Sequence, residues 1–484
     1  MSNFANVMRT KANETLTENG AVAYRSTNGG ALLDLYAKAG SLRRWSAEDI
    51  ISDWKAARKD NEELADNLIL YIRDIRNAGL GERRVGRILL KELARLNPAK
   101  VQRNFDTIVS AGRWDDLFEL FGTALEESVI KFTVSQIVKD LEGMAANQPI
   151  SLLAKWMPSI NTSSAETRAR ARKICKTVGT SERNYRKMLS KLRGYLKVLE
   201  KKMSAQEWNT IEYSTIPAIA ARRYQDAFVK NDGERYQAYL DALEKGEVKV
   251  NAATLYPYEI VRPYITYSGN TNPVLDEAQW KKLPNYVNGE FNVVVMADVS
   301  GSMESPNYQP IATSIGLAIY FAQRNKGAYH NLFMNYSEEA EFIELQDSWD
   351  IQRCVREANK NPHYNTNLDN AFRNIYNVAI KAGETPKALV IISDGQFDYD
   401  CGRRFDESIV GKWNRKFREA GLSEIKVISW NVNGRDNVMA TVKDDVTYCS
   451  GYGVGPFKFM TELIDKSAWD CMVAILTQPE FSWK

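Results

Sequence analysis

The chain has 484 residues, of which 44% are hydrophobic and 26% are charged, the usual balance of a protein that folds around a packed core. It contains no uninterrupted apolar run of about 18 residues, and its first residues, MSNFANVMRTKANE, lack the apolar core of a secretory signal, so we expect neither a membrane span nor export. Five cysteines without any CxxC spacing argue against a zinc ribbon or a disulfide framework and favour a reduced, cytoplasmic setting.

The net charge of +3 is unevenly distributed along the chain. Residues 1–290 carry 44 Lys and Arg against 36 Asp and Glu, whereas residues 291–484 carry 20 against 25. Residues 151–200 alone hold 12 basic and 3 acidic residues. The small total therefore conceals a basic segment and an acidic C-terminal part.

Helical periodicity dominates the N-terminal half. Apolar residues recur at helical spacing in residues 64–75 and again in 85–93, with Asn77-Ala78-Gly79 and Asn97-Pro98 as the expected stops. Ser163 and Glu166 have the spacing of a capping box that opens a further helix. The remaining helices are expected at Trp114–Phe121, Glu127–Leu141, Ala165–Val178, Glu182–Met203 and Tyr224–Leu243. Helices joined by short loops, without a clean internal repeat, predict an irregular α-helical solenoid.

The period changes near residue 291. Short apolar strands follow: FNVVVMADV, HNLFMNY, EAEFIEL, KALVIISD, IKVISWNV and DVTYCS. Helical stretches separate them, which predicts a doubly wound, mostly parallel, Rossmann-like sheet. Residues 265–290 are rich in Asn, Pro and Gly and are expected to form a linker. We therefore predict an α-helical domain at 1–285 and an α/β domain at 286–484.

Oxygen-bearing side chains gather at the ends of two predicted strands. Asp298, Ser300 and Ser302 follow the first strand, Asp394 ends a later one, and Thr366 precedes a helix between them. Because the carboxyl ends of parallel strands form the binding crevice of such a sheet, these side chains are expected to meet there. Two carboxylates and three hydroxyls are hard oxygen donors, which suit Mg²⁺ or Mn²⁺.

The order of these five residues resembles the metal-ion-dependent adhesion site (MIDAS) of von Willebrand factor A domains. The resemblance covers roughly residues 288–484 and implies that the bound metal accepts an Asp or Glu from a protein partner as its last ligand. The alternative is a plain strand-to-helix turn in which a serine caps the helix.

Other sites that such residues can form lack their defining patterns. Residues 298–302 have a serine, Ser300, where the DxD motif of a phosphatase needs a second carboxylate. The chain also has no GxSxG motif of a hydrolase and no GxxxxGK[ST] motif of a P-loop. Gly451, Gly453 and Gly455 are expected to form a flexible turn rather than a dinucleotide site. With two histidines, His330 and His363, and no visible nucleophile and base pair, we expect no catalysis.

The basic segment forms two predicted helices separated by a loop that contains glycine. One-sided charge of this kind favours contact with the phosphates of a nucleic acid, although charge runs are often only solvated helix faces. The candidate phosphate ligands are Lys155, Arg168, Arg170, Arg172, Lys173, Lys176, Arg183, Arg186, Lys187, Lys191, Arg193 and Lys197.

A helical N-terminal half followed by a metal-binding A domain resembles the architecture of Ro ribonucleoproteins, whose helical part is the TROVE module. The stretches GLGERRVGRILLKEL, GRWDDLFEL and SLLAKWMPSINTSS resemble a related bacterial and phage family. The resemblance implies a HEAT-like ring of helices closed by the A domain. It also implies RNA as a ligand, either small structured noncoding RNA or single-stranded ends.

These observations predict a non-catalytic, cytoplasmic RNA-binding protein whose A domain binds Mg²⁺ and an acidic residue of a partner. The alternative is a metal-dependent protein-interaction module without RNA, serving a remodelling ATPase or the assembly of a phage particle. We expect no association with membranes in either case.

Overall fold

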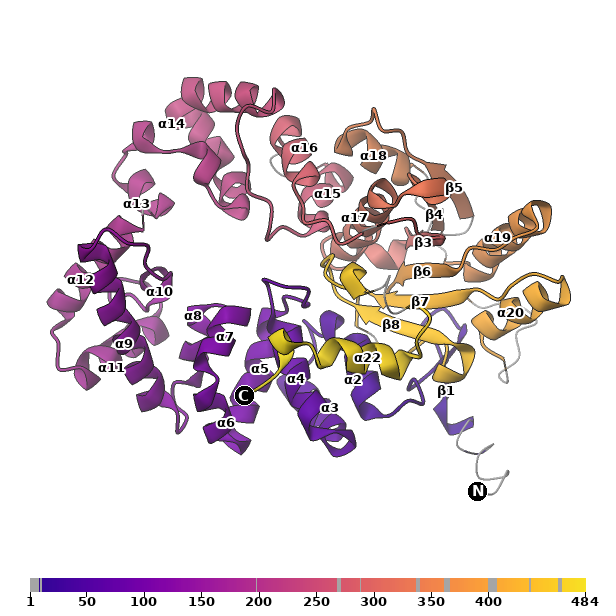
Figure 1. Ribbon diagram of the computed structural model, residues 1–484, viewed down its shortest axis with the longest axis horizontal. Helices are drawn as coiled ribbons and strands as arrows, with labels where there is room; N and C mark the ends of the chain where they lie inside the picture. Colours follow the sequence, from indigo (N-terminus) through magenta and orange to yellow (C-terminus); the bar gives the residue numbers. More distant parts are fainter. Residues whose placement is uncertain are drawn as a thin grey trace.

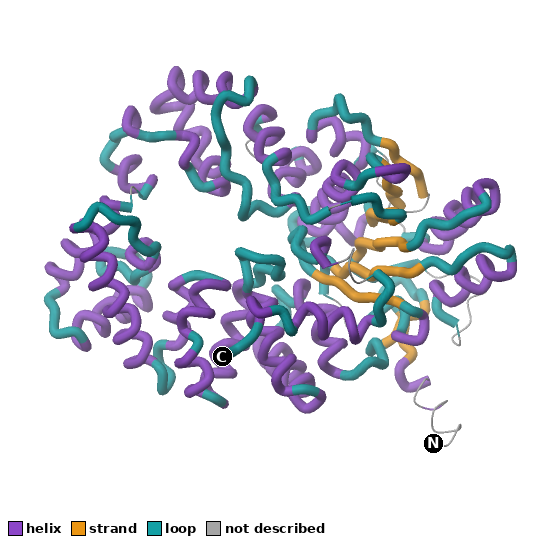
Figure 2. The backbone as a smooth tube through the Cα atoms, in the orientation of Figure 1, coloured by secondary structure: helices purple, strands orange, loops and turns teal. Residues whose placement is uncertain are grey.

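The computed structural model describes residues 8, 11–196, 198–267, 271–287, 289–336, 340–360, 366–398, 407–434, 437–459 and 464–484. Its helices and strands follow one another around a ring, which closes where the C-terminal sheet packs against the first helices of the chain (Figure 1). Figure 2 shows the strands gathered on one side of this ring and helices making up the rest. None of the helices in these ranges is long and apolar enough to cross a bilayer.

The N-terminal half begins with a two-stranded hairpin and continues as packed helices. The hairpin pairs β1 (Glu14–Leu16) with β2 (Val22–Tyr24) in antiparallel fashion. The helices that follow are α2 (Ala31–Lys38), η1 (Ala39–Ser41), α3 (Ala47–Asp60), α4 (Glu62–Arg73), α5 (Arg83–Leu96), α6 (Pro98–Arg103), α7 (Phe105–Ala111), α8 (Trp114–Leu117), η2 (Phe118–Leu120), α9 (Glu126–Ala145), α10 (Leu153–Trp156), α11 (Ala165–Thr177) and α12 (Glu182–Tyr195). The helical character expected for this half is therefore present.

Several helix boundaries differ from the sequence expectation; the helix expected at Tyr224–Leu243, for example, spans Ala218–Glu244. Asn97-Pro98 ends α5 but also begins α6, because the Asn97 side chain accepts a hydrogen bond from Lys100 N at 3.0 Å and proline fits the first helical turn. The N-cap of α11 is Ser164 rather than Ser163, since Ser164 Oγ accepts from Thr167 N at 3.2 Å. Two adjacent serines give the same sequence signal, and only the backbone geometry selects one.

The expected helix 182–203 is two helices, because the chain passes there from one core to another. Leu189 and Leu192 at the end of α12 belong to the core of residues 21–192. Leu199 and Met203 pack instead against a separate core formed by residues 211–275. The elements around this second core are α13 (Leu199–Ser204), η3 (Trp208–Thr210), η4 (Tyr213–Thr215), α14 (Ala218–Glu244) and part of α16 (Pro273–Lys281). Helix α15 (Pro257–Thr266) packs instead with the C-terminal sheet.

The expectation of a linker at 265–290 is wrong. Helix α16 lies inside this stretch, starts at the Asn272 cap with Pro273 in its first turn, and buries Trp280 almost completely, at 2% exposure. Its Trp280 Nε1 donates to Gln323 Oε1 at 2.7 Å. Asn and Pro mark a helix start here as readily as a loop, so composition misled the prediction.

The C-terminal sheet has six strands in the order β5-β4-β3-β6-β7-β8, all parallel except β5. The strands are β3 (Val293–Asp298), β4 (Leu332–Tyr336), β5 (Ala340–Glu344), β6 (Ala388–Ser393), β7 (Lys426–Asn431) and β8 (Val446–Ser450). The helices are η5 (Gly301–Glu304), α17 (Gln309–Arg324), η6 (Gly327–Tyr329), α18 (Ile351–Ala358), α19 (Leu368–Ala382), α20 (Ile409–Glu419), η7 (Val442–Asp444), α22 (Ala468–Leu476) and η8 (Pro479–Phe481). This is the mostly parallel α/β arrangement that the alternation of strands and helices predicts.

Both faces of the sheet are covered, as its continuous apolar strands require. Along β3, Val293 and Val295 pack with α15 and α17. Val294 and Met296 on the opposite face share a core with α19, α20 and the N-terminal helices. The hydrophobic core of the helical half therefore continues into one face of the sheet.

The ring closes through backbone contacts at the glycine-rich stretch 450–455. A Cβ atom on Gly40 would lie 2.6 Å from Gly451 Cα, and one on Gly455 would lie 2.6 Å from the Ala78 carbonyl oxygen. Gly40 N donates to Ser450 Oγ at 2.9 Å. The expectation of a flexible turn is wrong, because these glycines allow segments about 400 residues apart in sequence to pack backbone against backbone.

The C-terminal residues reinforce this closure. Trp483 Nε1 donates to Asp66 O in α4 at 2.7 Å, and Lys484 N donates to Asn104 Oδ1 at 2.8 Å. Asn67 Nδ2 in α4 also donates to Leu476 O at 3.0 Å. The C-terminal residues are thus fastened to the helical half of the chain.

Candidate functional site

The sheet brings two of the five expected metal ligands to adjacent strand ends. Strands β3 and β6 are parallel neighbours with Ala297 beside Ile392, so Asp298 and Ser393 end the two strands side by side. Ser393 Oγ donates to Asp298 Oδ2 at 2.6 Å, and Asp394 is the next residue. The carboxyl edge of the sheet therefore holds Asp298 and Asp394 together, as the strand order predicts.

The loop after β3 folds back on Asp298. Ser300 N donates to Asp298 Oδ1 at 2.9 Å, and the Oγ atoms of Ser300 and Ser302 lie 3.2 Å apart. Asp298 and Ser300 are fully buried, whereas Ser302 is partly exposed. This turn thus brings the two serine hydroxyls together and bonds its own backbone to Asp298.

Thr366 joins the same edge through the loop after β6. Thr366 N donates to Asp398 Oδ2 at 2.5 Å, and Thr366 O accepts from Asp398 N at 2.9 Å. In the same loop Gln396 N donates to Asp394 Oδ1 at 3.1 Å. We call this assembly of Asp298, Ser300, Ser302, Thr366 and Asp394 the rim.

The two carboxylates of the rim lie close enough to influence one another electrostatically. Burial raises the pKa of Asp298, and the nearby Asp394 carboxylate raises it further, although hydrogen bonds from Ser300 and Ser393 oppose both effects. Thr366 Oγ1 is buried and makes no hydrogen bond within the described part of the chain. A buried hydroxyl without a partner costs free energy unless a ligand satisfies it.

These residues fit Mg²⁺ or Mn²⁺ in donor type. Across the described ranges no three His, Cys, Asp or Glu side chains converge on a metal position, so an ion at the rim would depend on hydroxyls and water beside two carboxylates. Mg²⁺ tolerates such a shell because it keeps several of its own waters. The bound ion would supply a Lewis-acidic position able to accept an oxygen from another molecule.

The structure divides the predicted phosphate ligands into two groups. On α11, carboxylates hold three of the cations: Arg170 pairs with Glu166 and Glu119, Arg172 with Glu182, and Lys173 with Glu126. Arg168 Nη1 donates to the Thr162 carbonyl oxygen, and Lys176 is exposed. The charge of α11 is therefore largely neutralised by neighbouring elements.

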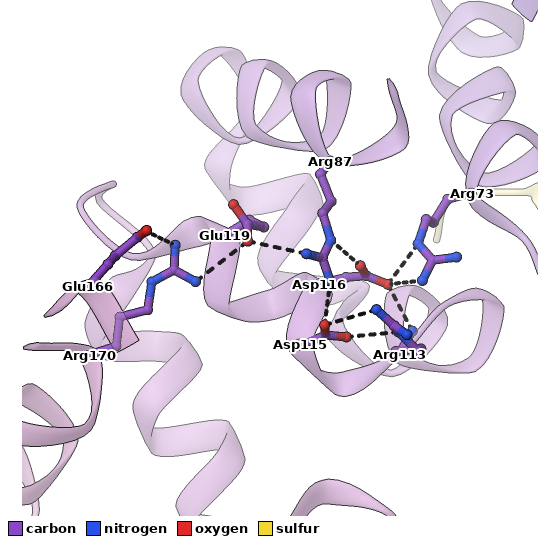
Figure 3. A network of polar contacts seen from close by, with 8 residues as sticks. All are labelled: Arg73, Arg87, Arg113, Asp115, Asp116, Glu119, Glu166 and Arg170. Atoms are coloured by element: carbon purple, nitrogen blue, oxygen red, sulfur yellow. Dashed lines mark hydrogen bonds and ion pairs between the residues drawn. The ribbon is translucent and has the colours of Figure 1, made fainter. Parts of the chain in front are cut away.

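The pairs of α11 continue into a polar network between α4, α5 and α8. Asp116 accepts from Arg73 and Arg87, and Arg87 reaches Glu119, which also pairs with Arg170 (Figure 3). The side chains of Arg73 and Asp116 are 7% and 1% exposed. This network binds helices to one another and offers little free charge to a ligand.

On α12 the cations face an open groove instead. The groove has a volume of about 1090 Å³ and lies between the segment 155–161, α12 and α13. Of the predicted ligands, Lys155, Arg183, Arg186, Lys187 and Arg193 line it, and Lys191 is exposed on α12 outside it. We call this the basic groove.

One of these residues has a structural task. Arg193 donates to Ala154 O at 2.8 Å, to Met157 O at 2.9 Å and to Ser159 Oγ at 3.0 Å. It thereby fixes the wall of the basic groove. Burial also lowers the pKa of the Arg193 guanidinium.

Lys201, which the charge pattern did not single out, lines the basic groove from α13. The expected single helix 182–203 hid the turn that brings α13 back toward α12. The basic pair Lys201-Lys202 was the available signal. Three residues lie outside the described ranges: the candidate phosphate ligand Lys197, His363, and Cys401, one of the five cysteines.

Comparisons with known proteins cover both halves. A family model described as a domain of unknown function, DUF2828, matches residues 121–290, and a second, DUF7788, matches residues 292–470. An uncharacterised protein of Acanthamoeba polyphaga mimivirus is 29% identical over 481 residues, covering 90% of this chain and 82% of the viral protein.

Two solved structures are also similar. The Ro protein of Deinococcus radiodurans matches over 92% of both chains, with 13% identity and a TM-score of 0.35. Proximal thread matrix protein 1 from the mussel byssus, solved with a zinc-occupied MIDAS motif, matches with 12% identity and a TM-score of 0.26. That match covers 37% of this chain and less than half, 48%, of the mussel protein.

Proposed function

We propose that this protein is a non-catalytic RNA-binding protein that holds RNA phosphates in the basic groove. The observation that carries the proposal is the charge of the groove lining. Six cations, Lys155, Arg183, Arg186, Lys187, Arg193 and Lys201, face it, and Glu200 is the one acid among its described lining residues.

Electrostatics supports a polyanion as the ligand. Cations without a neutralising carboxylate attract the phosphates of a nucleic acid. Binding releases the counterions condensed on those phosphates, so the affinity falls steeply as the salt concentration rises. Val198 in the groove lining is apolar and partly exposed, so a base or ribose can pack against it. RNA in the form of structured noncoding RNA or single-stranded ends suits this combination.

The rim supplies the second part of the proposal. Asp298, Ser300, Ser302, Thr366 and Asp394 would hold Mg²⁺ or Mn²⁺, and the ion would accept an Asp or Glu carboxylate from a protein partner. Cys175, Cys354 and Cys449 form no disulfide, which suits work in the reducing cytoplasm.

The test measures RNA affinity at two salt concentrations, about 50 and 200 mM. Fluorescence anisotropy with a labelled single strand and a labelled hairpin RNA compares the wild type with Arg183→Gln/Lys187→Gln. The matched control is Arg172→Gln/Lys173→Gln, which removes the same charge from the paired cations of α11.

The groove variant should weaken binding and reduce the salt slope for the single strand by about 1.4, or roughly 0.7 for each phosphate that the protein no longer neutralises. The α11 variant should bind nearly as the wild type does. Equal decreases in affinity in both variants would show that net charge, and not the groove, holds the RNA. Binding without salt dependence would contradict the proposal.

A second candidate function is a metal-dependent protein-interaction module without RNA. The partly exposed Ser302 beside the buried Asp298 and Ser300 favours it, since an ion held there would be accessible from outside. A pull-down with Mg²⁺ and with a chelator, repeated with Asp298→Ala, tests this function. Capture that needs Mg²⁺ and Asp298, together with no RNA binding, would select it over the first.

A further inference from the structure

The turn of the N-terminal hairpin is fastened to the loop after β6, which carries Asp394 and is hydrogen-bonded to Thr366. Thr17 Oγ1 donates to Phe397 O at 2.6 Å, and Glu18 N donates to Gln396 Oε1 at 2.8 Å. Asn19 Nδ2 donates to Gln396 O at 2.9 Å. Each of these hydrogen bonds joins segments about 380 residues apart, so the fold has brought the hairpin to this loop.

The loop 396–398 in turn positions the rim. Gln396 N donates to Asp394 Oδ1, and Asp398 is bonded to both backbone polar groups of Thr366. A displacement of the loop would therefore move Asp394 and Thr366 together. Thr17 and Gln396 are 5% and 1% exposed, so water does not readily replace the buried hydrogen bond from Thr17 to Phe397 O.

A second attachment holds the hairpin in place. Tyr24 N donates to Val438 O at 2.9 Å, and Val438 N donates to Tyr24 O at 2.8 Å. Within the turn, Thr17 Oγ1 also accepts from Ala21 N at 2.9 Å. The Thr17 hydroxyl thus links the internal geometry of the turn to the position of the loop.

We propose that the hairpin turn 17–20 is a positioning element of the metal centre, and that hairpin docking and metal binding stabilise one another. Residues around a metal that orient its ligands commonly change affinity by about 10- to 100-fold. Linkage makes the effect reciprocal, so the bound ion also stabilises the docked hairpin. Because the hairpin belongs to the helical half and the rim to the sheet, ion binding would strengthen the closure of the ring.

This inference rests on the metal centre of the proposed function, and the experiment separates the two. Isothermal titration calorimetry measures Mn²⁺ affinity of the full chain for the wild type, Thr17→Val, Thr17→Ser and Thr27→Val. Valine removes the hydroxyl but keeps the β-branched shape, and serine keeps the hydroxyl. Thr27→Val is the matched control, because the Thr27 hydroxyl donates to Asp34 at 2.6 Å within the N-terminal segment and does not reach the rim.

We expect Thr17→Val to weaken Mn²⁺ binding about tenfold, with Thr17→Ser and Thr27→Val close to the wild type. Hydrogen exchange of residues 17–24 should slow when Mn²⁺ binds to the wild type. If Thr17→Val does not fold, Gln396→Leu removes the acceptor of Glu18 N and should weaken binding in the same direction.

Wild-type affinity in Thr17→Val and Gln396→Leu, while exchange shows the turn released, would overturn the inference and leave the metal centre standing. Hydrogen exchange of residues 17–24 at the same rate with and without bound Mn²⁺ would also overturn the inference. A wild type that binds no Mn²⁺ would overturn the metal centre and this inference together, without touching RNA binding.

Discussion

Helices α11 and α12 are neighbours with similar basic composition, yet the structure uses their charges in opposite ways. The cations of α11 meet carboxylates from α9, from η2 and from the start of α12. Those of α12 line the basic groove, where Glu200 is the one acid among the described lining residues. A basic run in a sequence can therefore bind an anionic ligand only where the folded chain does not pair its cations with carboxylates.

At the rim, the like charges that lie together are negative rather than positive. There two carboxylates lie together at one sheet edge, and the charge of one raises the pKa of the other. In the network of Figure 3, arginines and carboxylates neutralise one another. The cations of the basic groove would be neutralised by RNA phosphates. The carboxylates of the rim would be neutralised by a metal ion.

Asp116→Ala should have the largest effect, on stability. It leaves the buried Arg73 guanidinium without its carboxylate, and breaking such a pair costs about 3–5 kcal/mol. The measurement is the free energy of unfolding in urea. A decrease below about 1 kcal/mol would mean that the network behaves like a solvated surface and that our division between paired and open cations is wrong.

Metal binding at the rim should have the next largest effect. At a free Mg²⁺ concentration of one hundred times Kd, the gain in stability is about 2.7 kcal/mol. A thermal shift assay with and without Mg²⁺ measures it, and Asp298→Asn should remove the gain while keeping the side-chain shape. A gain that persists in Asp298→Asn would place the ion elsewhere.

Lys201→Gln should weaken RNA binding by about 1 kcal/mol, the usual net contribution of one hydrogen bond. The salt slope for a single strand should fall by about 0.7. Lys176→Gln is the matched control, since Lys176 is exposed on α11 and does not line the groove. The assignment of α13 to the groove fails if the two variants bind alike.

Arg172→Gln should have the smallest effect. Its side chain is 61% exposed and that of its partner Glu182 is 48% exposed, and exposed ion pairs contribute about 0–1 kcal/mol. Urea unfolding and RNA anisotropy should both stay close to the wild type. A marked decrease in RNA affinity would show that the ligand displaces Glu182 and that α11 shares the binding surface.

Much of the fold was open to sequence reasoning because its signals are local. Alternating strands and helices after residue 291 predicted the six strands that the sheet contains. The prediction failed where one pattern serves two structures, as at Asn272-Pro273, which begins α16 rather than a linker. It also failed at 182–203, where the chain changes core although the helical pattern continues.

The sequence by itself determined the strands, the helical half and the five oxygen-bearing residues of the rim, because strand period, helix period and strand-end position are properties of neighbouring residues. Tertiary structure decided which cations are paired with carboxylates and which remain accessible to a ligand. Lys173 is neutralised by Glu126, 47 residues away, and no local pattern encodes that ion pair. It also decided that the ring closes at Gly40 and Gly451 and that Thr17 reaches Phe397, since contacts between such distant segments arise only when the whole chain packs.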